Sequence, residues 1–303
     1  MYMPKLSIII PYYKGKSFLI RLLDSIFRSY SGISGKLDIE ILILIDCSTP
    51  LDVVTTLIND NLTAEQSGII KIFRNEKNFG VARTRNRGFK LSIGDYIHFI
   101  DQDDEISTDF FETILPLLGK KDFILSNGII MDTDSKVQYQ LYNLAPVVNL
   151  RKLILKSFIR SPGQVVLKRA LVEDIRFTSA RKYFGADDKF FWIDIYLSTK
   201  EIKSAYINKC LYIAHKHRKN YSNNYRELSL SCLELWEQFR PRMNSPQQIA
   251  LMEQDIRIQR FILRDFRSAG DRLRCCWDFL MYKVDLNSFI RFLNKSIKKL
   301  YTK

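Results

Sequence analysis

The chain has 303 residues, 46% hydrophobic and 26% charged, a globular composition that excludes a wholly disordered protein. Its length is enough to bury one or two cores. Lys and Arg outnumber Asp and Glu by 47 to 33, and this net charge of +14 favours an anionic partner such as nucleic acid, a membrane surface or a phosphate-bearing substrate.

Strand and helix signals alternate over the first hundred residues. Short apolar runs predict buried strands over residues 6–10, 39–45, 69–73 and 96–100. Apolar side chains at helical spacing predict helices over residues 18–27, with Ser17 as the cap, 53–58 and 81–91. This alternation indicates an α/β fold with a mainly parallel central sheet flanked by helices. Because ligands of such sheets bind at the carboxyl ends of strands, the polar residues that follow each strand are the candidate site.

The pattern becomes mixed after about residue 106. Further strands are predicted over residues 123–130, 137–142, 165–167 and 211–214, the first two as a hairpin. Residues 150–158 predict a helix, and the signal is helical from residue 225 to the end. We therefore expect residues 1–105 and 106–222 to be two halves of one domain, followed by a basic C-terminal helical extension over residues 223–303.

Three carboxylates, Asp101, Asp103 and Asp104, directly follow the strand at 96–100. Clustered carboxylates repel each other, so they are stable together mainly when a cation joins them, and hard oxygen ligands suit Mg²⁺ or Mn²⁺. The alternative is a solvated acidic turn that caps a helix at Asp109.

Two further groups follow strands or open helices. Asp46, after the second strand, is suited to accept hydrogen bonds from a base or ribose, or alternatively to cap the next helix. Arg83, Arg85 and Arg87 cannot share one helical face, so some must turn toward the sheet edge, where phosphates are met. The alternative is a basic surface helix.

An acidic pair and a basic loop complete the candidates. Asp187 and Asp188 precede an aromatic run, and a carboxylate against such apolar surface becomes a better base; alternatively Asp187 caps the helix. His215 and His217 lie in a basic stretch after the strand at 211–214, which is suited to clasp a diphosphate or to complete a metal shell. His98, inside a strand, is expected to be structural.

The order of these pieces resembles the family 2 glycosyltransferases, which are inverting enzymes with the GT-A fold. The segments that carry the resemblance are SIIIPYY at 7–13, IDCST at 45–49, NFG at 78–80, RNRG at 85–88, FIDQDD at 99–104 and DD at 187–188. The resemblance implies transfer of a sugar from a nucleotide diphosphosugar, a UDP-sugar, to a hydroxyl of a glycan or lipid-linked glycan. Residues 1–105 would then be the nucleotide-sugar-binding half, and residues 106–222, with Ser161 to Gln164, the acceptor-binding half.

The resemblance also implies a role for each matching residue. The residues implied in nucleotide-sugar binding are Pro11, Tyr13, Asp46, Asn78, Gly80, Arg85, Asp101 and Asp104, and we add His217 from the basic loop. Asp103, with Asp101, would hold Mn²⁺ or Mg²⁺. Asp188 would be the catalytic base with Asp187 beside it. The sequence departs from the family pattern at Ile45 and Cys47, where the pattern has aspartate and glycine.

Two other functions compete with this interpretation. A sugar nucleotidyltransferase would carry a Gly-rich loop near its N-terminus, but residues 11–17 contain a single glycine, Gly15. A basic nucleic-acid-binding protein is suggested by the charge, but no zinc-finger, helix-turn-helix or RNA-binding signature is present, so we expect no nucleic acid partner. A catalytically silent binder of nucleotide sugars is a third alternative. Acceptors in capsule, O-antigen or lipooligosaccharide synthesis are typical of bacterial enzymes of this type.

Localisation is predicted from cysteines, apolar runs and charge. The five cysteines are odd in number and lack CxxC spacing, which favours reduced thiols in the cytoplasm. No apolar stretch approaches the ~18 residues of a membrane-spanning helix, and the run at 6–10 is short for a secretory signal. Residues 257–303 hold 12 Lys or Arg against 4 Asp or Glu, a net of +8. These basic amphipathic helices suggest a peripheral position on the inner face of the cell membrane, or packing on the catalytic domain instead.

Overall fold

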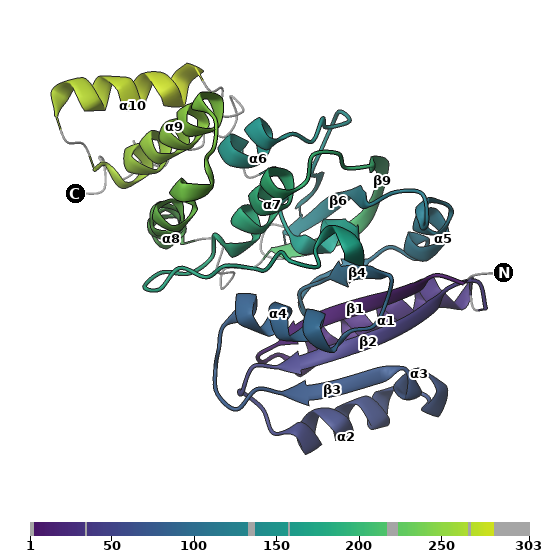
Figure 1. Ribbon diagram of the computed structural model, residues 1–303. Coiled ribbons are helices and arrows are strands. Elements are labelled where there is room, and N and C mark those ends of the chain that lie inside the picture. Colours follow the sequence, from purple (N-terminus) through teal and green to yellow (C-terminus); the bar gives the residue numbers. More distant parts are fainter. Residues whose placement is uncertain are drawn as a thin grey trace.

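The computed structural model describes residues 3–33, 35–132, 137–156, 158–216, 224–265 and 268–281. Nine strands form one sheet in the order β3-β2-β1-β4-β8-β6-β9-β5, with β7 paired to β6 (Figure 1). The first four strands along the chain are parallel to one another. Among the rest, β6 and β9 form a further parallel pair, and the other pairs are antiparallel. This mixed sheet with helices on both faces confirms the predicted α/β class.

The parallel part of the sheet is formed by apolar runs that are buried on both faces. Its strands are β1 (Lys5–Tyr12), β2 (Asp38–Ile45), β3 (Ile70–Arg74) and β4 (Tyr96–Phe99). Successive side chains of a strand point to opposite faces, so Ile8 and Ile10 of β1 enter one core and Ile9 enters the other. All four strands lie close to their predicted positions.

Each core lies between one sheet face and its helices. The first face is covered by α1 (Lys16–Ser31), α2 (Leu51–Asn61) and α5 (Phe110–Ile114), and α3 (Ala64–Gly68) precedes β3. The second is covered by α4 (Val81–Leu91), α6 (Leu150–Lys156) and α7 (Asp187–Ser198). The prediction that Ser17 caps α1 is wrong, because α1 begins one residue earlier, after Gly15 in the left-handed conformation.

The second half of the sheet is only partly as predicted. Its strands are β5 (Glu105–Ile106), β6 (Phe123–Asp132), β7 (Val137–Gln140), β8 (Val165–Lys168) and β9 (Ser204–Lys216). The β6–β7 hairpin is confirmed. The strand predicted at 211–214 is the end of the longer β9, which shifts register against β6 between Ser126 and Gly128. Short 3₁₀ helices lie at Leu115–Leu117, Pro162–Gln164, Arg169–Leu171 and Arg240–Arg242.

Three C-terminal helices confirm the predicted helical extension. They are α8 (Tyr225–Phe239), α9 (Pro246–Leu263) and α10 (Ala269–Met281), and Figure 1 shows them together at the end of the molecule opposite to β3 and α2. Helix α9 packs against α6, α8 and α10, and residues 282–303 lie outside the described part.

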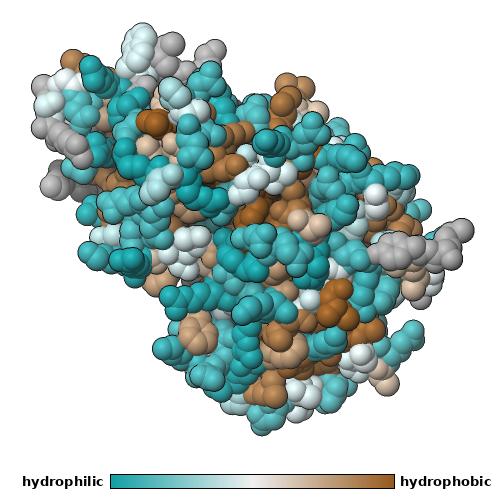
Figure 2. All heavy atoms as spheres, in the orientation of Figure 1, coloured by the Kyte–Doolittle hydropathy of each residue, from teal (hydrophilic) through white to brown (hydrophobic). Residues whose placement is uncertain are grey.

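The surface carries no sign of a membrane span in the part that the structure describes. The face shown in Figure 2 is mostly hydrophilic, and hydrophobic atoms interrupt it over the middle and the lower part of the view. No helix within the described ranges is both long and apolar enough to cross a bilayer.

Candidate active site

The loops that follow β1 and β4 meet at the carboxyl edge of the sheet. The backbone N–H of Tyr13, after β1, donates to Gln102 Oε1, after β4, at 2.8 Å. Pro11 is buried within β1, whereas the Tyr13 ring is 47% exposed. The structure therefore brings the predicted base-contacting residues beside the acidic loop, with one aromatic side chain open to a ligand.

Asp46 anchors the neighbouring loop. Its Oδ1 accepts hydrogen bonds from Asn75 Nδ2 and from the backbone N–H of Phe79, both at 2.8 Å, and its Oδ2 accepts from the backbone N–H of Gly80 at 2.9 Å. Asn78 is exposed on this loop. The alternative role of Asp46 as a helix cap is wrong, because α2 has no side-chain cap. A role of Asp46 in base recognition stays a prediction.

Arg85 connects three segments that are far apart in the chain. Its Nη2 lies 2.6 Å from Asp101 Oδ1, and its Nη1 lies 3.0 Å from Asp187 Oδ2, 102 residues away. The guanidinium also lies over the Phe177 ring, 5.1 Å from its centroid. Burial acts to lower the pKa of Arg85, but the two carboxylates outweigh it and the pKa is raised. Arg83 is exposed, so the arginines do occupy different faces of α4.

The acidic pair opens α7. The residue before the helix is Ala186, and Asp187 is the first helical residue, so the alternative of Asp187 as an N-cap is wrong. Burial, followed by the charge of Asp187, raises the pKa of Asp188 to about 7. A carboxyl with such a pKa is able both to take and to release a proton near neutral pH.

Like charges crowd the loop after β4. Asp104 is buried, and its Oδ2 accepts a hydrogen bond of 2.6 Å from the hydroxyl of Tyr212 in β9. Burial, followed by the charges of Asp103 and Asp101, raises the pKa of Asp104 well above its ordinary value. The backbone carbonyl of Asp103 accepts a hydrogen bond from Arg21 at 2.7 Å.

This crowding is the arrangement that a divalent cation relieves. Within the described residues, no three His, Cys, Asp or Glu side chains are grouped closely enough to form a complete metal site. Mg²⁺, however, usually binds through one or two protein carboxylates together with substrate phosphates. That Asp101 and Asp103 hold such an ion together with a phosphate-bearing substrate stays a prediction.

Two of the three histidines, His98 and His215, lie within the described residues. His215 is nearly buried at the end of β9, and its Nε2 lies 2.6 Å from Glu105 Oε1. His217 lies outside the described residues. His98 is buried, its Nδ1 is hydrogen-bonded to the Val165 carbonyl at 3.0 Å, and burial lowers its pKa to about 4, as expected of a structural residue.

Two side chains of the site were missed by the prediction. Tyr212, the partner of Asp104, is 108 residues away in the chain, and Phe177 lies under Arg85 from a loop without regular structure. Gly163 lies against the Tyr212 ring, where a Cβ would come within 2.7 Å, but this contact is visible only in the structure. Nothing in the local pattern around Phe177 distinguishes it from a core residue.

Comparison with known sequences gives relatives that are named as glycosyltransferases. A Haemophilus influenzae protein named "Uncharacterized glycosyltransferase" is 32% identical over 129 residues, which cover 42% of this chain and 48% of that protein. The chain therefore spans about half the length of that relative. The "Putative glycosyltransferase EpsH" of Bacillus subtilis is 24% identical over 249 residues, covering 77% of this chain and 67% of EpsH.

Two solved structures share the fold. TarS 1-349 of S. aureus in complex with UDP-GlcNAc has a TM-score of 0.61 at 21% identity and covers 85% of this chain and 73% of TarS. The mannosyltransferase PcManGT of Pyrobaculum calidifontis, in complex with GDP-Man and Mn²⁺, has a TM-score of 0.57 at 12% identity and covers 99% of this chain and 81% of its own. These likenesses confirm the predicted GT-A fold.

A family profile covers the part of this site that precedes α7. The profile described as "Glycosyl transferase family 2" matches residues 7–176, more than half of the chain. It includes β1 to β4, Arg85 and the loop at 101–104, and it ends before α7. The chain belongs to glycosyl transferase family 2.

Proposed function

We propose that this protein transfers a sugar from a nucleotide diphosphosugar to an acceptor hydroxyl with inversion at the anomeric carbon. One observation carries the proposal: Arg85 joins Asp101, in the loop after β4, to Asp187, at the start of α7. Asp188 is the next residue, so a carboxyl of raised pKa lies at the end of the sheet where donors bind. Family membership supports this function.

The residues of the chain would act as base, scaffold and charge. Asp188 would take the proton of the acceptor hydroxyl while that oxygen bonds to the anomeric carbon and the bond to the diphosphate breaks. Arg85 would keep the acidic pair at 187–188 in place relative to the loop at 101–104. Asp101 and Asp103 would hold Mn²⁺ or Mg²⁺, which when bound supplies positive charge to the leaving diphosphate.

The donor is proposed to be a UDP-sugar that carries a hexose or an N-acetylhexosamine. The TarS complex with UDP-GlcNAc supports this choice, whereas the PcManGT complex with GDP-Man makes a GDP-sugar the main alternative donor. The proposed acceptor is a glycan or lipid-linked glycan in capsule, O-antigen or lipooligosaccharide synthesis. Hydrolysis rates and melting shifts with a panel of UDP-, GDP- and dTDP-sugars decide the donor, and a preference for GDP-sugars contradicts the UDP assignment.

The base is tested by Asp188→Asn, which keeps the shape of the side chain and removes its proton affinity. We expect turnover to fall by about 10²–10⁴-fold while the affinity for nucleotide stays within twofold. Asp174→Asn, at an exposed position, is the matched control and should keep wild-type turnover. Wild-type rates in Asp188→Asn would show that another group is the base.

We also propose that the C-terminal helices rest on an anionic membrane surface. Leu273 and Trp277, one turn apart on α10, are 72% and 63% exposed, and with Arg257 and Arg274 they line a hollow of about 550 Å³. Indole and guanidinium groups together suit the boundary of an anionic bilayer. The wild type should float with vesicles that contain phosphatidylglycerol, and Trp277→Ala with Arg274→Ala should float at least fivefold less. Equal flotation of both proteins contradicts the proposal.

A further inference from the structure

A second buried ion pair holds α7 directly behind the proposed base. Lys189, the residue after Asp188, places its Nζ 2.6 Å from Asp255 Oδ2 in α9. The two side chains are 7% and 1% exposed. The first turn of α7 is therefore fixed from two elements, by Arg85 of α4 through Asp187 and by α9 through Lys189.

The carboxylate of Asp255 is the centre of a saturated cluster. Its Oδ2 also accepts from Trp236 Nε1 at 2.7 Å and from Cys232 Sγ at 3.3 Å, and its Oδ1 accepts from Gln259 Nε2 at 3.0 Å. These donors come from both α8 and α9, so the cluster ties these two helices to α7 at one point.

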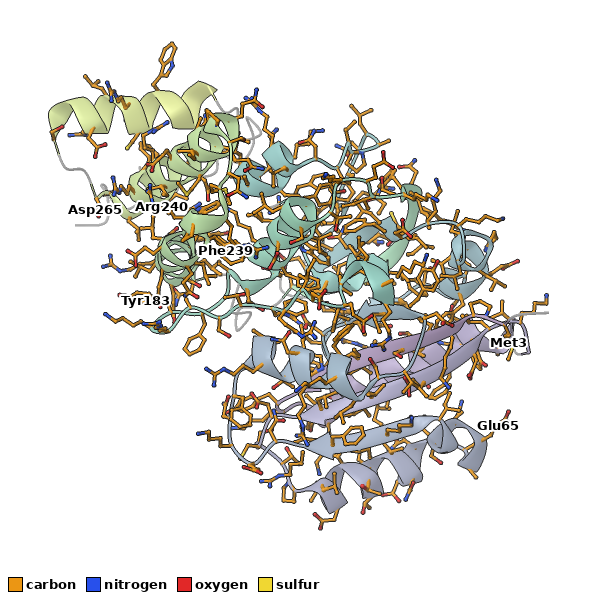
Figure 3. All side chains as sticks on the ribbon, viewed as in Figure 1. Met3, Glu65, Tyr183, Phe239, Arg240 and Asp265 are labelled. Atoms are coloured by element: carbon orange, nitrogen blue, oxygen red, sulfur yellow. The ribbon has the colours of Figure 1, made fainter. Side chains whose placement is uncertain are left out.

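Apolar packing already joins the same elements. Phe190 of α7 lies edge-on to Trp236 and Phe239 of α8, with ring centroids 4.8 and 4.9 Å apart, and Figure 3 shows the labelled Phe239 between α8 and α7. A buried ion pair adds little net stability over well-packed apolar groups, because both charges must be desolvated. What the Lys189–Asp255 pair does add is a defined orientation of α7 relative to α9, because a short charged hydrogen bond fixes one arrangement of its partners.

We infer that the Lys189–Asp255 pair is a positioning contact through which α8 and α9 hold Asp188 in line for proton transfer. This inference rests on the proposed role of Asp188. It assigns a function to helices that lie beyond residues 7–176, the part of the chain that the family profile matches.

The decisive variant is the double substitution Lys189→Met with Asp255→Asn. It leaves no uncompensated charge in the core, because both ionised groups are removed together, and the amide oxygen still accepts from Trp236. The single variant Asp255→Asn, by contrast, leaves the Lys189 ammonium buried without its counterion and should unfold at lower temperature. The double variant thus separates the positioning role from plain stability.

A matched control exists in the same interface. Arg242, after α8, pairs with Asp194 two turns further along α7, and their side chains are 39% and 10% exposed. Arg242→Met therefore breaks a second ion pair between α7 and the C-terminal helices, but at a distance from Asp188. It should leave kcat within twofold of the wild type.

Two readouts are measured on the full chain: kcat and donor KM, and hydrogen exchange of the peptide that covers residues 186–195. For the double variant we expect kcat at least about tenfold lower, since small misplacements of a base are costly. Donor KM should stay within twofold, because the donor loops are untouched, and the peptide should exchange faster than in Arg242→Met.

The other possible results also test the inference. If the double variant matches Arg242→Met in kcat and exchange, the pair is only structural and the inference is wrong. If the wild type turns over no nucleotide sugar, the proposed function fails, and the exchange rate alone then decides whether the pair orders α7. If the double variant does not fold, Trp236→Phe removes one donor to Asp255 and keeps a smaller aromatic ring; an unchanged kcat there overturns the inference, and a several-fold loss at constant KM supports it.

Discussion

The two ion pairs that hold the first turn of α7 differ in their access to solvent. On one side, which we call the donor side, Arg85 of α4 binds Asp101 and Asp187. The side chains of these two aspartates are 33% and 10% exposed. On the opposite side, Lys189 and Asp255 are 7% and 1% exposed. An exposed carboxylate is able to exchange a protein cation for a ligand or metal, whereas a sealed pair is not. We therefore expect the donor side to respond to substrate and the other side to stay fixed.

The two sides also differ in hydrogen-bond saturation. Asp255 accepts hydrogen bonds from four different side chains. Arg85 Nε, in contrast, is buried and has no hydrogen-bond partner among the described residues. Among these residues the Arg85 guanidinium therefore keeps an unused donor, whereas the Asp255 carboxylate does not lack partners.

The largest expected effect comes from breaking the donor-side pair. Arg85→Met leaves Asp101 and Asp187 without the cation between them, so we expect the free energy of unfolding to fall by about 3–5 kcal/mol and turnover to be lost. Denaturant unfolding of the variant beside Arg83→Met measures the effect. Arg83 is exposed, and its replacement should change stability by no more than about 0.5 kcal/mol. Equal losses of unfolding free energy in the two variants would show that the ion pairs of Arg85 do not stabilise the fold.

The second effect is a pH dependence in which activity and stability move in opposite directions. Asp188 must be ionised to act as a base, and its pKa is about 7, so kcat/KM should rise as the pH goes from 6 to 8. The folded state holds this proton more tightly than the unfolded chain. Its stabilising contribution is therefore full below about pH 4 and is lost as the pH rises to about 7.

Asp188→Asn separates these two trends. The variant has no such proton to lose, so its stability relative to the wild type should increase between pH 5 and pH 8, on the order of 1 kcal/mol or more. Urea unfolding of both proteins at the two pH values measures this difference. A difference that is constant with pH would mean that the Asp188 carboxyl titrates normally in the folded protein.

The third effect tests whether the donor side responds to ligand. Asp103→Ala should weaken the Mn²⁺-dependent binding of UDP by at least about tenfold and leave the unfolding midpoint nearly unchanged. Asp255→Asn should do the reverse, with lower stability and unchanged UDP affinity in the folded protein. Calorimetric titration with and without Mn²⁺ checks both, with Asp24→Ala, exposed on α1, as the control. Unchanged affinity in Asp103→Ala would refute the metal assignment.

The same contrast explains which features could be read from the sequence. Strands β1 to β4 are short apolar runs, and the candidate site residues follow directly at the strand ends, so local pattern located Asp46 and the loop at 101–104. The partners of these residues were not predictable. Arg85 and Asp187 are 102 residues apart, and Lys189 and Asp255 are 66 apart, so only tertiary packing brings them together.

The second half of the sheet shows the same limit. Only the end of β9 was predicted, because its first six residues include no buried side chain and its pairing with β6 is irregular. The division into residues 1–105, 106–222 and 223–303 stays a prediction, and its first boundary falls within β5. The part of the predicted helical extension after residue 281 lies outside the described residues.

The smallest expected effect concerns backbone strain on the donor side. Cys47 has a φ of 64°, in the left-handed region, where the family pattern has glycine. Cys47→Gly should therefore stabilise the protein by up to about 1 kcal/mol, reduced by the loss of the contact between its Sγ and the Glu76 carbonyl. Cys210→Gly, within strand β9, is the control and should destabilise, because a strand residue gains nothing from glycine. Thermal melting of both variants measures the difference. A lower melting temperature for Cys47→Gly would show that its side-chain contacts outweigh the strain, and that the loop after β2 is stabilised by this cysteine.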